Sequence, residues 1–133
     1  MRTVFLDSVG FLATWDTRDQ WHTQAAAVFA ALLHEGAVLL TTELILAECG
    51  NAASRKPYRS RVEALRRQLA GQGRIAVIDQ ALLDEAWRAY ALAGSGGAGL
   101  VDQTSFIVMP RLGITEAFTN DKHFKAAGFT TLF

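Results

Sequence analysis

The stretch Thr3-Val4-Phe5-Leu6-Asp7 opens the chain with a short apolar run that stops at an acid. Runs that stay apolar, rather than alternating with polar residues, are typical of strands buried inside a parallel sheet. Another strand is predicted at residues 115–119, shortly before Asp121. Ligands bind outside the carboxyl ends of the strands in open parallel sheets, so Asp7 and Asp121 are predicted to reach the same edge.

The rest of the chain alternates between strand and helix patterns. Further strands are predicted at residues 37–41, 74–78 and 130–132. Helices are predicted at residues 21–33, 58–71, 101–112 and 121–127, with two more that begin after Thr42 and after Asp79. This alternation predicts an α/β fold with a mostly parallel sheet. The 133 residues, half of them apolar, suit a single domain over residues 1–133.

The helix after Asp79 is predicted to bury one stripe of its surface. Apolar residues recur there at helical spacing, and they are Leu82, Leu83, Ala86, Trp87 and Tyr90. The glycine-rich segment 94–99 that follows is interpreted as a surface loop, because the chain beyond it is too short to fold alone.

Two more acids are placed so that they can lean toward the acidic edge. Asp102 lies at the start of helix 101–112, and Glu48 lies within the helix that leaves the second strand. Taken singly, each acid has an ordinary alternative, because aspartates cap helices and Glu48 could be a solvated helix residue. Glu43 is not expected to join them, since five positions along a helix separate two side chains by about 140°.

Four carboxylates in one pocket repel one another and lose hydration, so the cluster is expected to bind a cation. Hard oxygen ligands select Mg²⁺ or Mn²⁺, and the shortage of histidine and thiol ligands disfavours zinc. A cation can orient water for attack on phosphorus and stabilise the leaving oxygen. The predicted reaction is phosphodiester hydrolysis, and the predicted catalytic and metal-binding residues are Asp7, Glu48, Asp102 and Asp121.

The motifs around these acids resemble those of the PIN-domain family. They read Phe5-Leu6-Asp7-Ser8, Thr41-Thr42-Glu43-Leu44-Ile45-Leu46-Ala47-Glu48, Leu100-Val101-Asp102-Gln103-Thr104-Ser105-Phe106 and Ala117-Phe118-Thr119-Asn120-Asp121-Lys122-His123-Phe124. The last motif is the most specific, and the run from Leu100 to Phe129 looks especially like the VapC-type toxins. The resemblance implies a three-layer α/β/α sandwich and an endoribonuclease that needs Mg²⁺ or Mn²⁺. It also implies a homodimer and a small antitoxin protein that silences the enzyme.

The chain departs from the family pattern at three places, which bear on rate and substrate preference more than on fold. Val9 stands where many relatives have asparagine, Val101 where serine or threonine often precedes the third acid, and segment 94–99 where the loop is often charged. One alternative therefore stays open, namely a PIN-fold module that binds RNA or antitoxin with weak or no catalysis.

Two other enzyme classes agree less well with the sequence. A haloacid-dehalogenase-type enzyme needs an acid at the position of Val9. A receiver domain needs an acidic pair after the first strand and a lysine after a fifth strand, and only its middle acid has a counterpart, Asp79.

Charge is unevenly distributed although the formal net charge is zero. Residues 55–74 contain seven basic residues and one acid, Glu63, which leaves the remainder of the chain acidic. This basic segment is interpreted either as a solvated helix face or as a patch that steers phosphates toward the acidic site.

The remaining signals are weaker. The sequence has no leader-like segment and no apolar stretch of roughly 20 residues, so a soluble, cytoplasmic protein without a membrane segment is expected. Cys49 is expected to be a small core residue. Of the three histidines, His123 is the best candidate for a contact at the rim of the site. The three tryptophans, Trp15, Trp21 and Trp87, are predicted to lie in the core or an interface.

Overall fold

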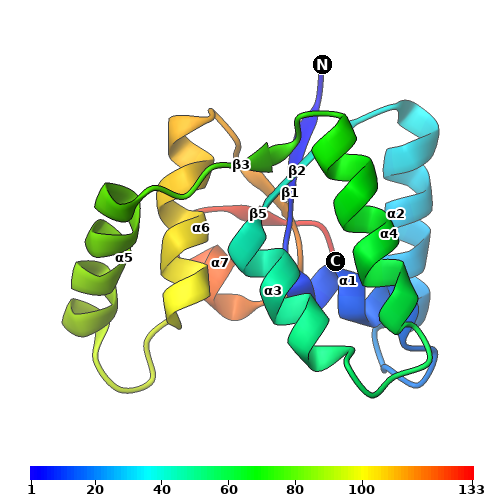
Figure 1. The fold of residues 1–133 in the computed structure, drawn as a ribbon, viewed down its shortest axis with the longest axis horizontal. Coiled ribbons are helices and arrows are strands. Elements are labelled where there is room, and N and C mark those ends of the chain that lie inside the picture. Colours follow the sequence, from blue (N-terminus) through cyan, green and yellow to red (C-terminus); the bar gives the residue numbers. More distant parts are fainter.

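The computed structural model describes residues 1–133 and places a five-stranded sheet between two layers of helices (Figure 1). The strands are β1 (Thr3–Leu6), β2 (Val38–Thr42), β3 (Ile75–Ala76), β4 (Glu116–Phe118) and β5 (Thr130–Thr131), in the spatial order β3-β2-β1-β4-β5. Every neighbouring pair is parallel, and Phe5 lies opposite Leu40 of β2 and Ala117 of β4. The predicted α/β fold is confirmed, with a sheet that is parallel throughout.

Seven helices surround this sheet. Three lie on one side, α1 (Ser8–Trp15), α2 (His22–Glu35) and α4 (Arg59–Gly71), and three on the other, α5 (Gln80–Ala93), α6 (Leu100–Arg111) and α7 (Lys122–Ala126) (Figure 1). Helix α3 (Glu43–Ala52) leaves the end of β2 and packs against α1 and α4. The three-layer sandwich is thus confirmed. None of the helices combines the length and the apolar character that a membrane span requires.

The centre of the fold is β1, whose last three residues have no exposed surface. Aromatic side chains fill the space on both sides of the sheet. On the α1 and α2 side, Phe29 stacks on Phe118 with ring centroids 5.5 Å apart. On the α6 and α7 side, the edge of one ring faces the other in the pair Phe106 and Phe124, with centroids 4.9 Å apart. Burial of such large apolar surfaces is the main stabilising term in the fold.

Helix α1 has no counterpart among the predicted elements. Gly10 explains how it fits, because a Cβ atom at this position would lie 2.3 Å from the carbonyl oxygen of Phe118. The missing side chain lets α1, which begins just after the end of β1, approach β4 closely. The backbone that follows Asp7 is thereby held in place by the core.

Two predictions about the following elements are corrected by the structure. Strand 74–78 is shorter than predicted, with only Ile75 and Ala76 paired to β2. Helix α5 buries Leu82 and Ala86, whereas Trp87 and Tyr90 are 49% and 46% exposed. The reason is that α5 packs mainly against α6, so the side of α5 that carries Trp87 and Tyr90 stays exposed.

Candidate active site

The four predicted acids all lie at or beyond the carboxyl edge of the sheet. Asp7 directly follows β1, and Asp121 precedes α7 in the segment after β4. Glu48 lies in the second turn of α3, and Asp102 lies in the first turn of α6. Parallel strand order brings these segments, which are distant in sequence, to one edge.

Helix capping explains only one of the three aspartates. Asp121 caps α7, because its Oδ1 accepts the backbone N–H of His123 at 2.8 Å. The side chain of Asp7 makes no capping hydrogen bond to α1, and the N-cap of α6 is Gly99 rather than Asp102. Burial of Asp7 and Asp102 near other acids therefore needs another explanation.

Asp7 is the most deeply buried acid, with 1% of its surface exposed. Its Oδ2 accepts a hydrogen bond from the Thr119 hydroxyl at 2.8 Å, whereas its Oδ1 has no hydrogen-bond partner. Burial raises the pKa of Asp7 to about 6; the Thr119 bond opposes this effect, and the nearby charges of Glu48 and Asp121 add to it. A buried carboxylate oxygen without a partner is costly unless a ligand satisfies it.

Asp102 is in a similar environment on the opposite side of the cluster. Its pKa is raised to about 7, mainly by partial burial and to a lesser degree by the negative charges of Asp7, Asp121 and Glu48. All four acids therefore lie close enough to act on one another electrostatically. The tightest group comprises Asp102, Asp121 and His123, whose potential ligand atoms lie within 4.8 Å of one another.

Glu48 is the outermost of the four acids. Its residue is exposed, and its carboxylate accepts a hydrogen bond from the hydroxyl of Ser8. This bond joins α3 to the start of α1, next to Asp7. Glu43 lies elsewhere, on the side of α3 that faces Arg59 and Arg66 of α4, as the helical spacing predicted.

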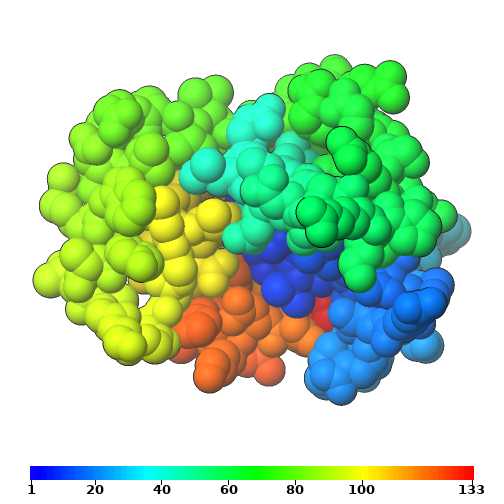
Figure 2. Space-filling model, turned by 60° about the horizontal axis from the view of Figure 1, so that its bottom comes forward, coloured from blue at the N-terminus to red at the C-terminus, as the bar shows by residue number.

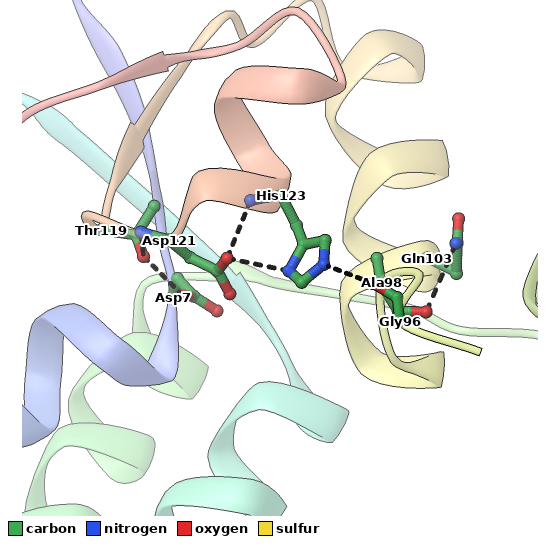
Figure 3. A network of polar contacts seen from close by, with 7 residues as sticks. All are labelled: Asp7, Gly96, Ala98, Gln103, Thr119, Asp121 and His123. Atoms are coloured by element: carbon green, nitrogen blue, oxygen red, sulfur yellow. Dashed lines mark hydrogen bonds and ion pairs between the residues drawn. The ribbon is translucent and has the colours of Figure 1, made fainter. Parts of the chain in front are cut away.

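Thr119 and His123 support the cluster; the position of His123 beside Asp121 agrees with its predicted contact at the rim, whereas the two hydrogen bonds of Thr119 could not be read from the sequence. The hydroxyl of Thr119 donates to Asp7 and also accepts the backbone N–H of Asp121 at 3.1 Å, so one buried side chain links both acids. The His123 ring lies between Asp121 and the glycine-rich loop (Figure 3). Its Nδ1 is 3.1 Å from Asp121 Oδ1, and its Nε2 is 3.3 Å from the Gly96 carbonyl oxygen.

This group of side chains fits a divalent cation. One oxygen of Asp7 is unpartnered and the charges of Glu48 and Asp121 act on this carboxylate, and hard oxygen donors are what Mg²⁺ and Mn²⁺ prefer. The candidate ligands are Asp7, Asp102 and Asp121, with Glu48 on the exposed side. The imidazole of His123 is a borderline ligand that Mn²⁺ accepts more readily than Mg²⁺ does.

The surroundings of the acids are visible in Figure 2, which turns this face forward. The start of α1 lies in the middle of the face and is bordered by α3, by α6 and by the segment around α7. Substrate can therefore approach the acids from solvent between these helices.

The structure separates the residues of the basic segment. Helix α4 begins near the acidic face and leads to the start of β3. Because β3 is parallel to β2, its start lies at the edge of the sheet opposite the acids. Successive residues of α4 therefore lie farther from the acids. Arg66 and Arg67 both pair with Glu63, at 2.8 and 3.7 Å. Only the beginning of the segment, around Lys56, stays near the acidic face.

Comparisons with known proteins identify the family of the chain. The model of the PIN domain family matches residues 4–130, and the chain belongs to this family. It is 28% identical to the 23S rRNA-specific endonuclease VapC20 of Mycobacterium tuberculosis over 127 residues, which is 95% of each protein. The resemblance to VapC-type toxins that the motifs indicated is therefore confirmed.

Solved structures give the same result. The crystal structure of Mycobacterium tuberculosis VapC20, described as a sarcin–ricin loop cleaving toxin, superposes with a TM-score of 0.81 at 25% identity and covers 96% of each chain. FitAcB from Neisseria gonorrhoeae shares the fold, with a TM-score of 0.63 at 16% identity over 98% of this chain and 96% of its own.

Proposed function

We propose that this protein is a metal-dependent endoribonuclease and the toxin of a toxin–antitoxin pair. The observation that carries this proposal is the buried carboxylate of Asp7, which has one unpartnered oxygen and interacts electrostatically with three other acids. A cluster of this kind is tolerated when a cation neutralises it. Membership of the PIN family and the similarity to VapC20 support RNA as the substrate.

The residues of the site have separable roles in this proposal. Asp7, Asp102 and Asp121 would hold Mg²⁺ or Mn²⁺, and Thr119 orients the carboxylate of Asp7 and holds the backbone of Asp121. Glu48, the exposed acid, is positioned by Ser8 to orient the attacking water and accept its proton. The cation, when bound, supplies the positive charge that polarises water and stabilises the leaving oxygen.

The substrate that we propose is ribosomal RNA. This rests on VapC20, a 23S rRNA-specific endonuclease that matches almost the entire chain. Single-stranded loops expose bases and phosphates that a duplex hides, so a loop within 23S rRNA is the expected target. Such a substrate also agrees with a cytoplasmic location.

The experiment is cleavage of purified 23S rRNA, with an unrelated RNA of equal length as the comparison, in Mg²⁺, in Mn²⁺ and in EDTA. We expect a discrete product from 23S rRNA with either metal and none with EDTA. Asp7→Asn serves as the inactive control. RNA that is bound but never cut under any metal condition would favour the alternative of a binding module without catalysis.

A small antitoxin is the proposed protein partner. A cavity of about 330 Å³ between α2 and α4 has apolar walls that include Phe29 and Leu65, with Arg61 and Arg74 also lining it. These features suit an amphipathic segment that carries acidic residues. Charge reversal at Arg61 should weaken capture of the antitoxin encoded beside the toxin gene, and unchanged capture would exclude this cavity.

A further inference from the structure

We propose that a small cavity at the end of α1 binds one nucleotide of the RNA strand that passes through the acidic site. This inference rests on the proposed ribonuclease function and adds residues outside the acidic cluster. The cavity has a volume of about 250 Å³ and is lined by Trp15 and Arg18 near the end of α1 and by Lys56 and Tyr58 before α4. It is smaller than the roughly 300–1,000 Å³ of sites that enclose drug-sized ligands, so it suits a single nucleotide.

Two helices lead from the acids to this cavity. Helix α1 begins after Asp7 and ends at Trp15, which places the two residues about 12 Å apart along the helix. Helix α3 carries Glu48, packs against α1 and ends shortly before Lys56. In Figure 2 the segment after α1 and the segment before α4 lie next to each other on the same face as the acids. If one phosphate of an extended RNA strand lies at the acids, a nearby nucleotide of the same RNA can therefore reach the cavity.

The cations of the cavity are available for a phosphate. The side chains of Arg18 and Lys56 take part in none of the ion pairs of the protein. Asp16 also lines the cavity, and its carboxylate accepts a hydrogen bond from the backbone N–H of Arg18 at 3.0 Å. Arg66 and Arg67, by contrast, are both occupied by Glu63. Lys56 is one of the five basic residues of segment 55–74 that form no ion pair, and it is the one that lines this cavity.

The aromatic side chains provide a surface for a base. The rings of Trp15 and Tyr58 lie 6.2 Å apart at an angle of 36°, and Trp15 is held by stacking on Phe11 at 5.3 Å. Aromatic rings beside cations are the usual means of binding single-stranded RNA, because every base has a face that stacks. An acidic peptide would use the cations but not the rings, so we favour RNA.

Binding without cleavage gives the test. Asp102→Asn protein is titrated into a short, labelled single-stranded RNA, and anisotropy is recorded at several salt concentrations. Lys56→Ala should raise Kd several-fold and reduce the slope of log Kd against log salt by about 0.7, the value for one lost phosphate contact on a single strand. Arg67→Ala is the matched control, since it removes the same charge from α4 and should change both quantities little.

Tryptophan fluorescence tests whether RNA contacts Trp15, and it leaves both Trp15 and Tyr58 unchanged. Trp21→Phe and Trp87→Phe leave Trp15 as the single tryptophan, and light scattering compares the mass of this variant with that of the wild type because Trp87 lies on the proposed dimer face. RNA should quench its emission, and Lys56→Ala should shift the quenching to higher RNA concentration. Absence of quenching, or equal effects of Lys56→Ala and Arg67→Ala on Kd, would overturn the subsite while cleavage by the wild type still supports the ribonuclease. Antitoxin binding that depends on Lys56, with RNA affinity unchanged, would also overturn it.

Discussion

Asp7 and Asp102 make the metal-free protein sensitive to pH. Their pKa values are raised to about 6 and about 7, from an ordinary value of about 3.9. The folded state therefore binds protons that the unfolded state has already released, and raising the pH removes this source of stability. In EDTA, Tm should fall as the pH rises from about 4 to about 7. Asp102→Asn should flatten this dependence, and an equal dependence of Tm on pH in the variant and the wild type would contradict the raised pKa of Asp102.

Metal should reverse this destabilisation. A ligand at about 100 times its Kd adds roughly 2.7 kcal/mol to the free energy of unfolding, so Mn²⁺ should raise Tm at neutral pH. The increase should be much smaller in Asp102→Asn, which lacks one carboxylate of the proposed site. Equal metal-induced shifts in the variant and the wild type would show that the cation binds elsewhere.

Thr119 should matter for metal affinity although it is not proposed as a ligand. Its buried hydroxyl orients Asp7 and holds the backbone of Asp121. Loss of partners of this kind weakens metal binding by about 10–100-fold. Thr119→Val should therefore raise the Kd for Mn²⁺ in a calorimetric titration, whereas Thr119→Ser should restore most of the affinity. Equal affinities for both variants would assign the residue to packing alone.

Helix α5 forms where its apolar pattern predicted a helix, but two residues of that pattern, Trp87 and Tyr90, are exposed instead of buried. The rings of Trp87 and Tyr90 contact each other with centroids 5.4 Å apart and are about half exposed. Periodicity identifies an apolar stripe but not the surface that covers it. A second copy of the chain is the proposed cover, in line with the homodimer that the family resemblance implied.

The dimer can be tested by light scattering after size exclusion. Wild-type protein should have the mass of a dimer, and a combined Trp87→Ser and Tyr90→Ser variant should move toward the monomer without loss of helical signal. A wild-type monomer at high concentration, or a variant that stays dimeric, would exclude this face.

Helix α1 shows what sequence patterns miss. Its position depends on the contact of Gly10 with Phe118, more than a hundred residues away, which no local pattern contains. The long helices and buried β1, by contrast, have periodic or continuous apolar patterns that predicted them well. Gly10→Ala should lower the free energy of unfolding by about 1–3 kcal/mol through overpacking. Gly50→Ala is the control, since it has open space in α3 and should be neutral or stabilising in urea denaturation.

At the scale of the whole molecule, the sequence could predict the part of the candidate site that follows from the order of the parallel strands. A parallel sheet brings Asp7 and Asp121 to one edge, and the predicted helices placed Glu48 and Asp102 where they could lean toward it. The contact of His123 with Gly96 was not predictable, because it joins a ring to a backbone carbonyl 27 residues away. The direction of α4, which carries most of the basic segment away from the acids, likewise depends on three-dimensional arrangement.

The central claim is that Asp7, Glu48, Asp102 and Asp121 act together on one phosphodiester. Residues that act as a unit give non-additive losses, so Asp7→Asn combined with Asp121→Asn should cleave RNA little more slowly than either single variant. Each single variant should approach the rate in EDTA. Losses that multiply in the double variant would indicate that the two acids act independently.

The most direct measurement compares two glutamates on one helix. Glu48 and Glu43 both belong to α3, but only Glu48 faces the acidic cluster, whereas Glu43 faces α4. The cleavage rate of 23S rRNA in Mn²⁺ is measured for Glu48→Gln and Glu43→Gln, which remove the same charge. Our account predicts a rate near the EDTA background for Glu48→Gln and most of the wild-type rate for Glu43→Gln. Similar rates for the two variants, or a larger loss with Glu43→Gln, would contradict it.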